Sequence, residues 1–258
     1  MSHVHEIAPT LRTGLETHAV RFERALPASG TYKFTLGTRP GTMDAVIAST
    51  VVDADEYKLA TYAGPARAVL DLGGHIGSFS ALASRLFPEA RITVLEPAAF
   101  NTPVLGHNLV SVPNVTALYN AVGAHDGQII TVLNKYGENT GRNRATVDPN
   151  PAVHAVTKVL TLPTIARHAA VDYFDVVKID VEGAEYAVFD HPASAEILGQ
   201  AAYIVGELHD KRQIPRGIAW LRKWFKHVHV MPCDPEAAIF HAWQDADTGP
   251  RNIKPTVA

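Results

Sequence analysis

The amino-acid sequence contains one cysteine, Cys233, among its 258 residues. A solitary cysteine excludes a disulfide within the chain and leaves no cysteine-rich zinc site. There is no run of 18 apolar residues, and the first residues lack the basic start and the apolar stretch of a signal peptide. We therefore expect a cytoplasmic protein that does not have a membrane as its partner.

The sequence also has little excess charge of either sign. Lys and Arg together number 23 and Asp and Glu 26, which gives a net charge of −3 at pH 7. Such a chain has no global positive field, so we do not expect nucleic acid as a partner. None of the 13 histidines lies in an HExxH-type pair that would indicate a zinc enzyme. We expect a small molecule as the partner, with a homo-oligomer left open.

From residue 67 onward, short β-branched runs alternate with helical patterns. Strands are predicted at residues 67–72, 91–96, 115–120, 175–180 and 202–208, and helices at 76–87, 98–110, 163–170, 184–190 and 214–226. This alternation is typical of βαβ units around a parallel sheet. Two further runs, 227–232 and 237–243, are close enough in sequence to pair antiparallel at one edge. We predict an α/β, doubly wound, Rossmann-like sheet over residues 61–258, mostly parallel with an antiparallel edge strand.

Two regions interrupt this rhythm. Residues 127–135 and 155–162 are predicted as extra strands, joined by a long polar loop of the kind that is more often functional or mobile than inert. Residues 1–60 are predicted as an N-terminal extension that could cover the core. Within it we expect a hairpin in residues 31–50, and a helix at 53–63 that leads into the core.

The first strand of the predicted core ends in a glycine-rich turn, "DLGGHIG". In an open parallel sheet, ligands bind at this position. A dinucleotide fingerprint needs the spacing G-x-G-x-x-G, but His75 and Ser78 replace the second and third glycines. The wider spacing Asp71-x-Gly73-x-x-x-Gly77 suits a nucleoside with an amino-acid tail, S-adenosylmethionine. Its ammonium group could be accepted by Asp71 and the Gly73 carbonyl.

Two later segments support a nucleoside cofactor. Glu96 ends the second strand 19 residues after Gly77, where an acid accepts hydrogen bonds from ribose hydroxyls. Asn120, Ala121 and Val122 follow the third strand and are predicted to form an apolar wall with one polar contact beneath the adenine. The glycine turn alone could be a tight strand–helix connection, but the turn and the acid together favour the cofactor.

The segment "DVVKIDVEGAEYAVF" is more informative still. Acids at a helix N-terminus would explain Glu182 and Glu185, but not Lys178 inside an apolar strand. The motif "VVKIDVEGAE", preceded by "LDLGGHIGSFS", "VLEPAAFN" and "YNAVGAHDG", resembles the FkbM-type S-adenosylmethionine-dependent methyltransferases. The resemblance covers about residues 55–210, and the four motifs occur in the family's order.

This resemblance implies a class I methyltransferase fold and mostly O-methylation of sugar, polyketide or other small-metabolite hydroxyls, as in natural product biosynthesis. Together with the turn, it predicts these cofactor contacts: Asp71, Gly73, Gly74, His75, Gly77, Glu96, Pro97, Asn120, Ala121, Val122 and Asp180. Asp180 is also expected to face the transferred methyl group. The sequence departs from the family at Gly74 and His75, where Ala-Asn is usual, and at residues 162–165, where LPTI replaces LDDL. The role of His75 stays open.

An alcohol acceptor must lose its proton, and the fifth strand ends in "GELHD" beside Asp180. His209 is the predicted general base because its ordinary pKa, about 6.5, suits neutral pH, although a histidine that caps a strand would look the same. Lys178 and Asp180 complete the predicted catalytic group. Acceptor contacts are predicted for Arg142, Asn143, Glu182 and Glu207.

A metal ion offers another mechanism. Asp180, Glu207 and Asp210 could bind Mg²⁺ through oxygen ligands and lower the pKa of the acceptor hydroxyl, but we do not expect the ion to be essential. Three other functions stay open. They are an N- or carboxyl-directed methyltransferase of the same fold, a nicotinamide-dependent oxidoreductase, which the missing glycines disfavour, and a non-catalytic nucleoside-binding module.

Overall fold

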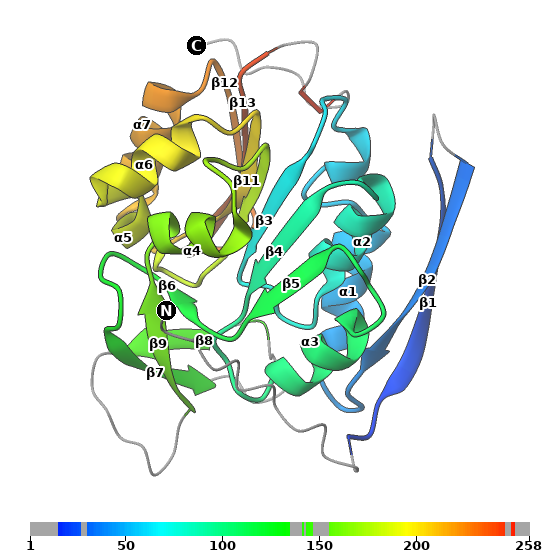
Figure 1. Cartoon of the computed structure of the whole chain (residues 1–258). Helices are drawn as coiled ribbons and strands as arrows, with labels where there is room; N and C mark the ends of the chain where they lie inside the picture. Colours follow the sequence, from blue (N-terminus) through cyan, green and yellow to red (C-terminus); the bar gives the residue numbers. More distant parts are fainter. Residues whose placement is uncertain are drawn as a thin grey trace.

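The central sheet of the protein has seven strands with helices on both faces (Figure 1). The structure, a computed structural model, describes residues 15–26, 30–134, 141, 143–146, 155–245 and 249–250. In spatial order the strands are β12 (His227–Pro232), β13 (Ala237–Trp243), β11 (Tyr203–His209), β10 (Val176–Ile179), β3 (Ala68–Leu72), β4 (Arg91–Leu95) and β5 (Val115–Leu118).

Five neighbouring strands, from β11 to β5, pair in parallel. β13 runs antiparallel to both β11 and β12, so β12 at the edge returns to the parallel direction. The predicted fold class is confirmed, and the strands of this sheet lie where the β-branched runs predict them. Because the sheet is buried on both faces, β3 and β10 are apolar along almost their whole length.

Helices from the two halves of the chain cover opposite faces of this sheet. One face carries α2 (Ser78–Leu86) and α3 (Thr102–Leu109) with α1 (Asp44–Val52). The other carries α4 (Leu162–Ala169), α5 (Glu185–Asp190), α6 (Pro192–Gly199) and α7 (Ile214–Trp224). Alternation along β3 explains the division, since Val69 packs into the first layer and Leu70 into the second.

The N-terminal segment differs from its prediction. Its hairpin joins β1 (His18–Leu26) to β2 (Gly30–Thr38), so it starts before the predicted range, and residues 44–52 form α1 instead of a strand. The Thr42 hydroxyl accepts a hydrogen bond from the Asp44 backbone N–H at 3.2 Å, a local turn contact that precedes the helix. The predicted helix at 53–63 is also wrong. Asp55 and Lys58 have left-handed φ angles of 49° and 53°, which a right-handed helix cannot include, and only a 3-10 turn (Leu59–Thr61) forms.

The described part of this segment packs into the main core. Phe22, Leu36, Val52 and Tyr57 are buried in the same hydrophobic cluster as Val69 of β3. The hairpin lies along the outer side of α1, α2 and α3, on the right of Figure 1. The segment is thus bound to the sheet through shared apolar packing.

A smaller sheet follows β5. Its order is β6 (Ala121–Val122), β9 (Ala155–Leu160), β7 (Ile129–Asn134) and β8 (Asn143–Thr146). The extra strands predicted at 127–135 and 155–162 are present as β7 and β9, whereas β6 and β8 were not predicted. Among the helices described, none combines the length and the apolar character needed to cross a membrane.

Candidate active site

A cleft opens where β3, β4, β5 and β10 end, and it contains about 900 Å³ of space, including the part open to solvent. Eleven of the predicted site residues line it: Gly73, Gly74, His75, Glu96, Pro97, Asn120, Ala121, Val122, Lys178, Asp180 and Glu182. The carboxyl ends of neighbouring parallel strands share one edge of the sheet, which brings these residues together. Apolar walls that were not predicted come from Ile47 and Val51 of α1 and Ile130 of β7.

The glycine turn is held tightly between two strands. Gly73 has a φ of +83°, and a Cβ there would lie 1.8 Å from the Asp180 carbonyl oxygen. A Cβ on Gly74 would lie 2.1 Å from Val94 of β4. The backbone N–H groups of both glycines donate to the Leu95 carbonyl, at 3.0 and 2.8 Å. Glycine is therefore needed here for close backbone packing.

Glu96 is buried, with 4% of its surface exposed, and both of its carboxylate oxygens accept hydrogen bonds. Oε2 accepts from the His75 backbone N–H at 2.8 Å, and Oε1 accepts from the Ala98 N–H at 2.9 Å and the Asn101 amide at 3.3 Å. Burial raises the pKa of Glu96, and these donors oppose the rise. The acid is thereby fixed in one orientation at the cleft.

The side chain of Lys178 contacts the glycine turn. Its Nζ donates to the Gly73 carbonyl at 2.7 Å and lies 3.3 Å from Asp71 and 3.8 Å from Asp180. Burial alone would lower the pKa of Lys178, but the charges of Asp71 and Asp180 outweigh burial and raise it. Asp71 is fully buried and also accepts from the Ser80 hydroxyl at 2.7 Å, so it contacts Lys178 and not the cleft.

Asp180 receives a hydrogen bond from the N-terminal segment. The Tyr57 hydroxyl donates to Asp180 Oδ2 at 3.0 Å, and the Lys178 ammonium lies 5.5 Å from the centre of the Tyr57 ring. Burial, followed by the charge of Asp180, holds the pKa of Tyr57 well above its usual value. Tyr57 is therefore a neutral donor that orients Asp180.

A group of carboxylates surrounds His209 at the other end of the site. His209 Nδ1 lies 2.8 Å from the buried Glu185, and Nε2 lies 3.3, 3.7 and 3.9 Å from oxygens of Glu207, Glu182 and Asp180. Burial alone would lower the pKa of His209, but its bonds to Glu185 and Glu207 dominate and raise it to about 12. The imidazole is protonated at neutral pH, so these surroundings do not support the prediction that it is the general base.

Two neighbouring carboxyl groups, those of Glu182 and Glu56, have pKa values closer to neutral pH. Burial raises the pKa of Glu182 to about 8, and burial with the charges of Glu207 and Asp180 raises that of Glu56 to about 7. Glu182 lines the cleft, and its backbone has a left-handed φ of 53°. A non-glycine residue in this conformation is uncommon and is often found at functional sites.

The predicted Mg²⁺ ligands are not brought together as a set. Asp210 turns away and binds the Arg212 side chain at 3.0 Å, which lowers the pKa of the Asp210 carboxyl. Within the described residues, Asp180, Glu182 and His209 instead offer ligand atoms within 4.8 Å of one another. The Lys178 ammonium and the protonated imidazole already place positive charge among these carboxylates.

Comparison with known families decides the assignment. The family described as the methyltransferase FkbM domain matches residues 71–228, more than half of the chain. The chain belongs to this family. It is thus an S-adenosylmethionine-dependent methyltransferase, as the ordered motifs predict, and the nicotinamide alternative is set aside. No curated protein sequence matches it.

Solved structures with similar folds are distant from this methyltransferase in sequence. A precorrin-6y C5,15-methyltransferase from Geobacter metallireducens has 17% identity and a TM-score of 0.47, over 78% of this chain and 89% of that chain. A ribosomal protein L11 methylase from Lactobacillus delbrueckii has 12% identity and a TM-score of 0.45, over 80% and 84% of the two chains.

Several predicted residues of the methyltransferase lie away from the cleft or outside the description. A Cβ on Gly77 would meet Leu105 and Leu109 at 3.1 Å, so this glycine serves the packing of α2 on α3. Arg142 lies outside the described residues, and only the backbone of Asn143 is described, in β8. Tyr57 was not among the predicted site residues, because the stretch around it was expected to form a helix.

Proposed function

We propose that this methyltransferase transfers the methyl group of S-adenosylmethionine to a hydroxyl of a small metabolite, such as a sugar or polyketide. The observation that carries the proposal is the two-ended cleft. One end has the glycine turn, Glu96 and an apolar slot, and the other has the carboxylates of Asp180 and Glu182.

The donor groups at the first end fit the cofactor. Glu96 offers acceptors at the place where ribose hydroxyls would lie, and Ala121, Val122 and Ile130 provide an apolar slot for a flat base. The Asn120 amide donates to the Lys158 carbonyl at 3.1 Å, which holds β9 beside this slot. When bound, S-adenosylmethionine supplies a methyl group that its sulfonium activates for in-line displacement.

The second end fits an acceptor that gives up a proton. Alignment of donor and acceptor supplies much of the acceleration in such a displacement, and a base near neutral pKa adds to it. Glu182 meets both requirements for the base, since it lines the cleft and its pKa is raised to about 8. Asp180, fixed by Tyr57 and close to Lys178, is proposed to orient the acceptor hydroxyl.

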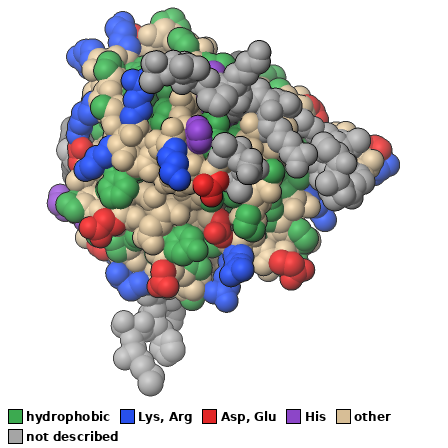
Figure 2. Space-filling model, turned by 90° about the horizontal axis from the view of Figure 1, so that it is seen from above, with side chains coloured by type: hydrophobic (Ala, Val, Ile, Leu, Met, Phe, Trp, Pro, Cys, Tyr) green, Lys and Arg blue, Asp and Glu red, His purple; other side chains and the backbone are tan. Residues whose placement is uncertain are grey.

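The charge balance of the chain is consistent with a small-molecule acceptor. Lys and Arg number 23 and Asp and Glu 26, and side chains of both signs occur on the described part of the face in Figure 2. Nucleic-acid binding normally needs a basic patch or stripe. We therefore keep a soluble hydroxylated metabolite as the proposed partner.

A methyl-transfer assay tests the proposal. Purified protein with S-adenosylmethionine labelled in the methyl group is incubated with pools of hydroxylated metabolites, amines and carboxylic acids, and products are analysed by mass spectrometry. Label in an ether product is the expected result. Label only in amines or esters would refute methylation of a hydroxyl, and cofactor binding without transfer to any pool would indicate a binding module.

A further inference from the structure

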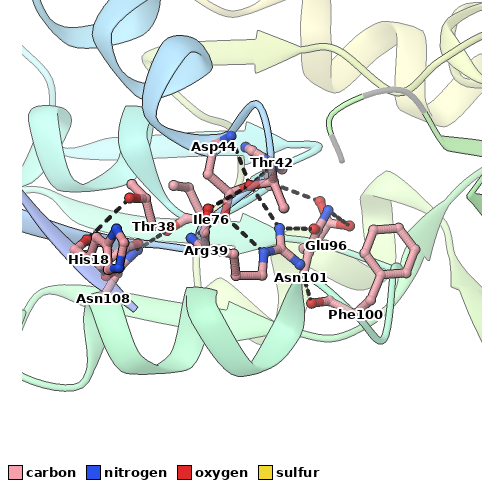
Figure 3. Close-up of polar contacts among 12 residues, drawn as sticks. His18, Thr38, Arg39, Thr42, Asp44, Ile76, Glu96, Phe100, Asn101 and Asn108 are labelled. Carbon is pink, nitrogen blue, oxygen red and sulfur yellow. Dashed lines mark hydrogen bonds and ion pairs between the residues drawn. The ribbon is translucent and has the colours of Figure 1, made fainter. Parts of the chain in front are cut away.

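A closed circuit of polar contacts joins the N-terminal segment to Glu96, the acid that is proposed to hold the ribose (Figure 3). Its members are Arg39, Asp44, His75, Asn101 and Glu96. Arg39 Nε and Nη2 donate to the two carboxylate oxygens of Asp44, at 2.8 and 2.9 Å. Arg39 Nη2 also donates to the Asn101 side-chain oxygen at 2.8 Å, and the Asn101 amide donates to Glu96 at 3.3 Å.

The second arm of the circuit passes through the glycine turn. His75 Nε2 lies 3.3 Å from Asp44 Oδ1, and the His75 backbone N–H donates to Glu96 Oε2 at 2.8 Å. Asp44 therefore reaches both oxygens of Glu96, through His75 on one side and through Arg39 and Asn101 on the other.

This circuit is buried and anchored. Asp44 and Asn101 have no exposed surface, and the side chain of Arg39 is 15% exposed. Arg39 Nη1 also donates to the Phe100 carbonyl at 2.6 Å, which ties it to the loop after β4. Hydrogen bonds to charged groups are strong, and a desolvated network of them fixes side chains in one arrangement.

The circuit also answers the open question about His75. Its backbone has a left-handed φ of 49°, a conformation in which Asn and His are enriched among non-glycine residues. An Asn, usual in the family, would fit the turn equally well, but its shorter side chain would not extend as far toward Asp44. The imidazole adds a link to α1 that the turn itself does not require.

We propose that Asp44 and Arg39 are positioning residues of the cofactor site, which orient Glu96 toward the ribose hydroxyls through His75 and Asn101. This inference rests on the proposed function, because it assumes that the ribose lies at Glu96. On this inference, the N-terminal segment contributes to binding of the nucleoside. Residues in one such network typically show coupling energies that correspond to about tenfold in affinity.

The test compares three variants. Asp44→Asn keeps the shape of the side chain and removes its charge, while His75→Asn suits the left-handed turn and removes only the imidazole link. The control is Asp175→Asn, whose carboxylate also ties two segments by accepting from the Arg67 and Ala68 N–H groups, at 2.7 and 2.9 Å. Asp175 precedes β10, at the opposite edge of the sheet from the cleft.

Calorimetry with S-adenosylhomocysteine and its 2′,3′-dideoxy analogue measures the effect. We expect Asp44→Asn to weaken binding of S-adenosylhomocysteine by about tenfold and His75→Asn by less, with a double variant no weaker than Asp44→Asn alone. The dideoxy analogue should bind Asp44→Asn and wild type alike. Asp175→Asn should keep wild-type affinity for both ligands.

The outcomes separate the two hypotheses. If wild type does not bind S-adenosylhomocysteine, the proposed function fails and this inference fails with it. If wild type binds but Asp44→Asn and His75→Asn keep its affinity, only the positioning role is overturned. An equal loss for both ligands would also overturn it, since a general loss of structure would not depend on the ribose hydroxyls. Should Asp44→Asn fail to fold, His75→Asn and the ligand pair decide alone.

Discussion

Replacing Gly73 by alanine should push apart the carboxyl ends of the neighbouring strands β3 and β10. Gly127 provides a matched control, because the two glycines have similar φ angles of +83° and +77°. A Cβ at Gly73 would lie 1.8 Å from the Asp180 carbonyl oxygen, whereas a Cβ at Gly127 would meet nothing within 4 Å. Comparing Gly73→Ala with Gly127→Ala therefore separates two losses of folding stability, one from the left-handed backbone and one from the steric clash of the new Cβ.

The left-handed conformation costs an alanine about 1 to 2 kcal/mol, which applies to both variants. At Gly73 the Asp180 carbonyl must also move until its contact is near 3.4 Å. That movement would break the bonds from Asp180 N–H to Leu72 at 3.0 Å and from Lys178 to Gly73 at 2.7 Å. One neutral and one charged hydrogen bond contribute about 1 and about 2 kcal/mol. Gly73→Ala should thus cost about 4 to 5 kcal/mol.

Thermal unfolding and calorimetry measure these effects. For a domain of this size, each kcal/mol lowers Tm by about 2 to 4 °C, so Gly73→Ala should lose about 8 to 20 °C and Gly127→Ala about 2 to 8 °C. S-adenosylhomocysteine should bind Gly127→Ala normally and Gly73→Ala weakly or not at all. Equal losses of Tm in the two variants, with normal binding by both, would refute the steric argument.

Four further outcomes are expected. Glu96→Ala should weaken S-adenosylhomocysteine binding at least tenfold in calorimetry, because charge-assisted ribose bonds are lost, and unchanged affinity would remove Glu96 from the site. Glu182→Gln should lower kcat by about 10² to 10⁴ and abolish a limb of the pH–rate profile that rises toward the pKa of about 8, whereas a retained limb would assign the proton to another group. Tm should fall as pH rises from about 6 to 9, because the raised pKa values of His209, Glu182 and Glu56 let the folded state hold protons that the unfolded chain releases. A flat or rising Tm would contradict these raised pKa values. EDTA should leave turnover in place, because Lys178 and His209 already supply positive charge, and activity that returned only with Mg²⁺ or Mn²⁺ would show otherwise.

The sheet was predictable because its signals are local. Strands buried on both faces need apolar β-branched residues, and those runs mark β3, β4 and β10 directly. The residues after each strand end then fall at the cleft without further information. The helix α6 was not predicted, although the sequence contains a signal for its start. Pro192 stands at the first helical position, where proline is favoured, and His191 caps the helix by accepting from the Ser194 N–H at 3.2 Å.

The N-terminal segment was not predictable in the same way. Asp55 and Lys58 adopt left-handed backbone angles that no sequence pattern marks, and Tyr57 between them donates to Asp180, 123 residues further on. Arg39 likewise donates to Asn101, 62 residues further on, and Asp44 contacts His75, 31 residues further on. Such long-range contacts override local propensity and become visible only when the fold brings the segments together.

The assignment of His209 shows why side-chain chemistry is harder to predict than side-chain position. A pKa near 6.5 describes an isolated histidine, and its sequence neighbours do not reveal how many carboxylates will face it. In the fold, one imidazole meets oxygens of Asp180, Glu182, Glu185 and Glu207. With fewer cations than carboxylates in this buried group, the imidazole keeps its proton and Glu182 becomes hard to ionise. The groups whose pKa values come nearest to neutral pH are then two carboxyls, Glu56 and, at the cleft, Glu182.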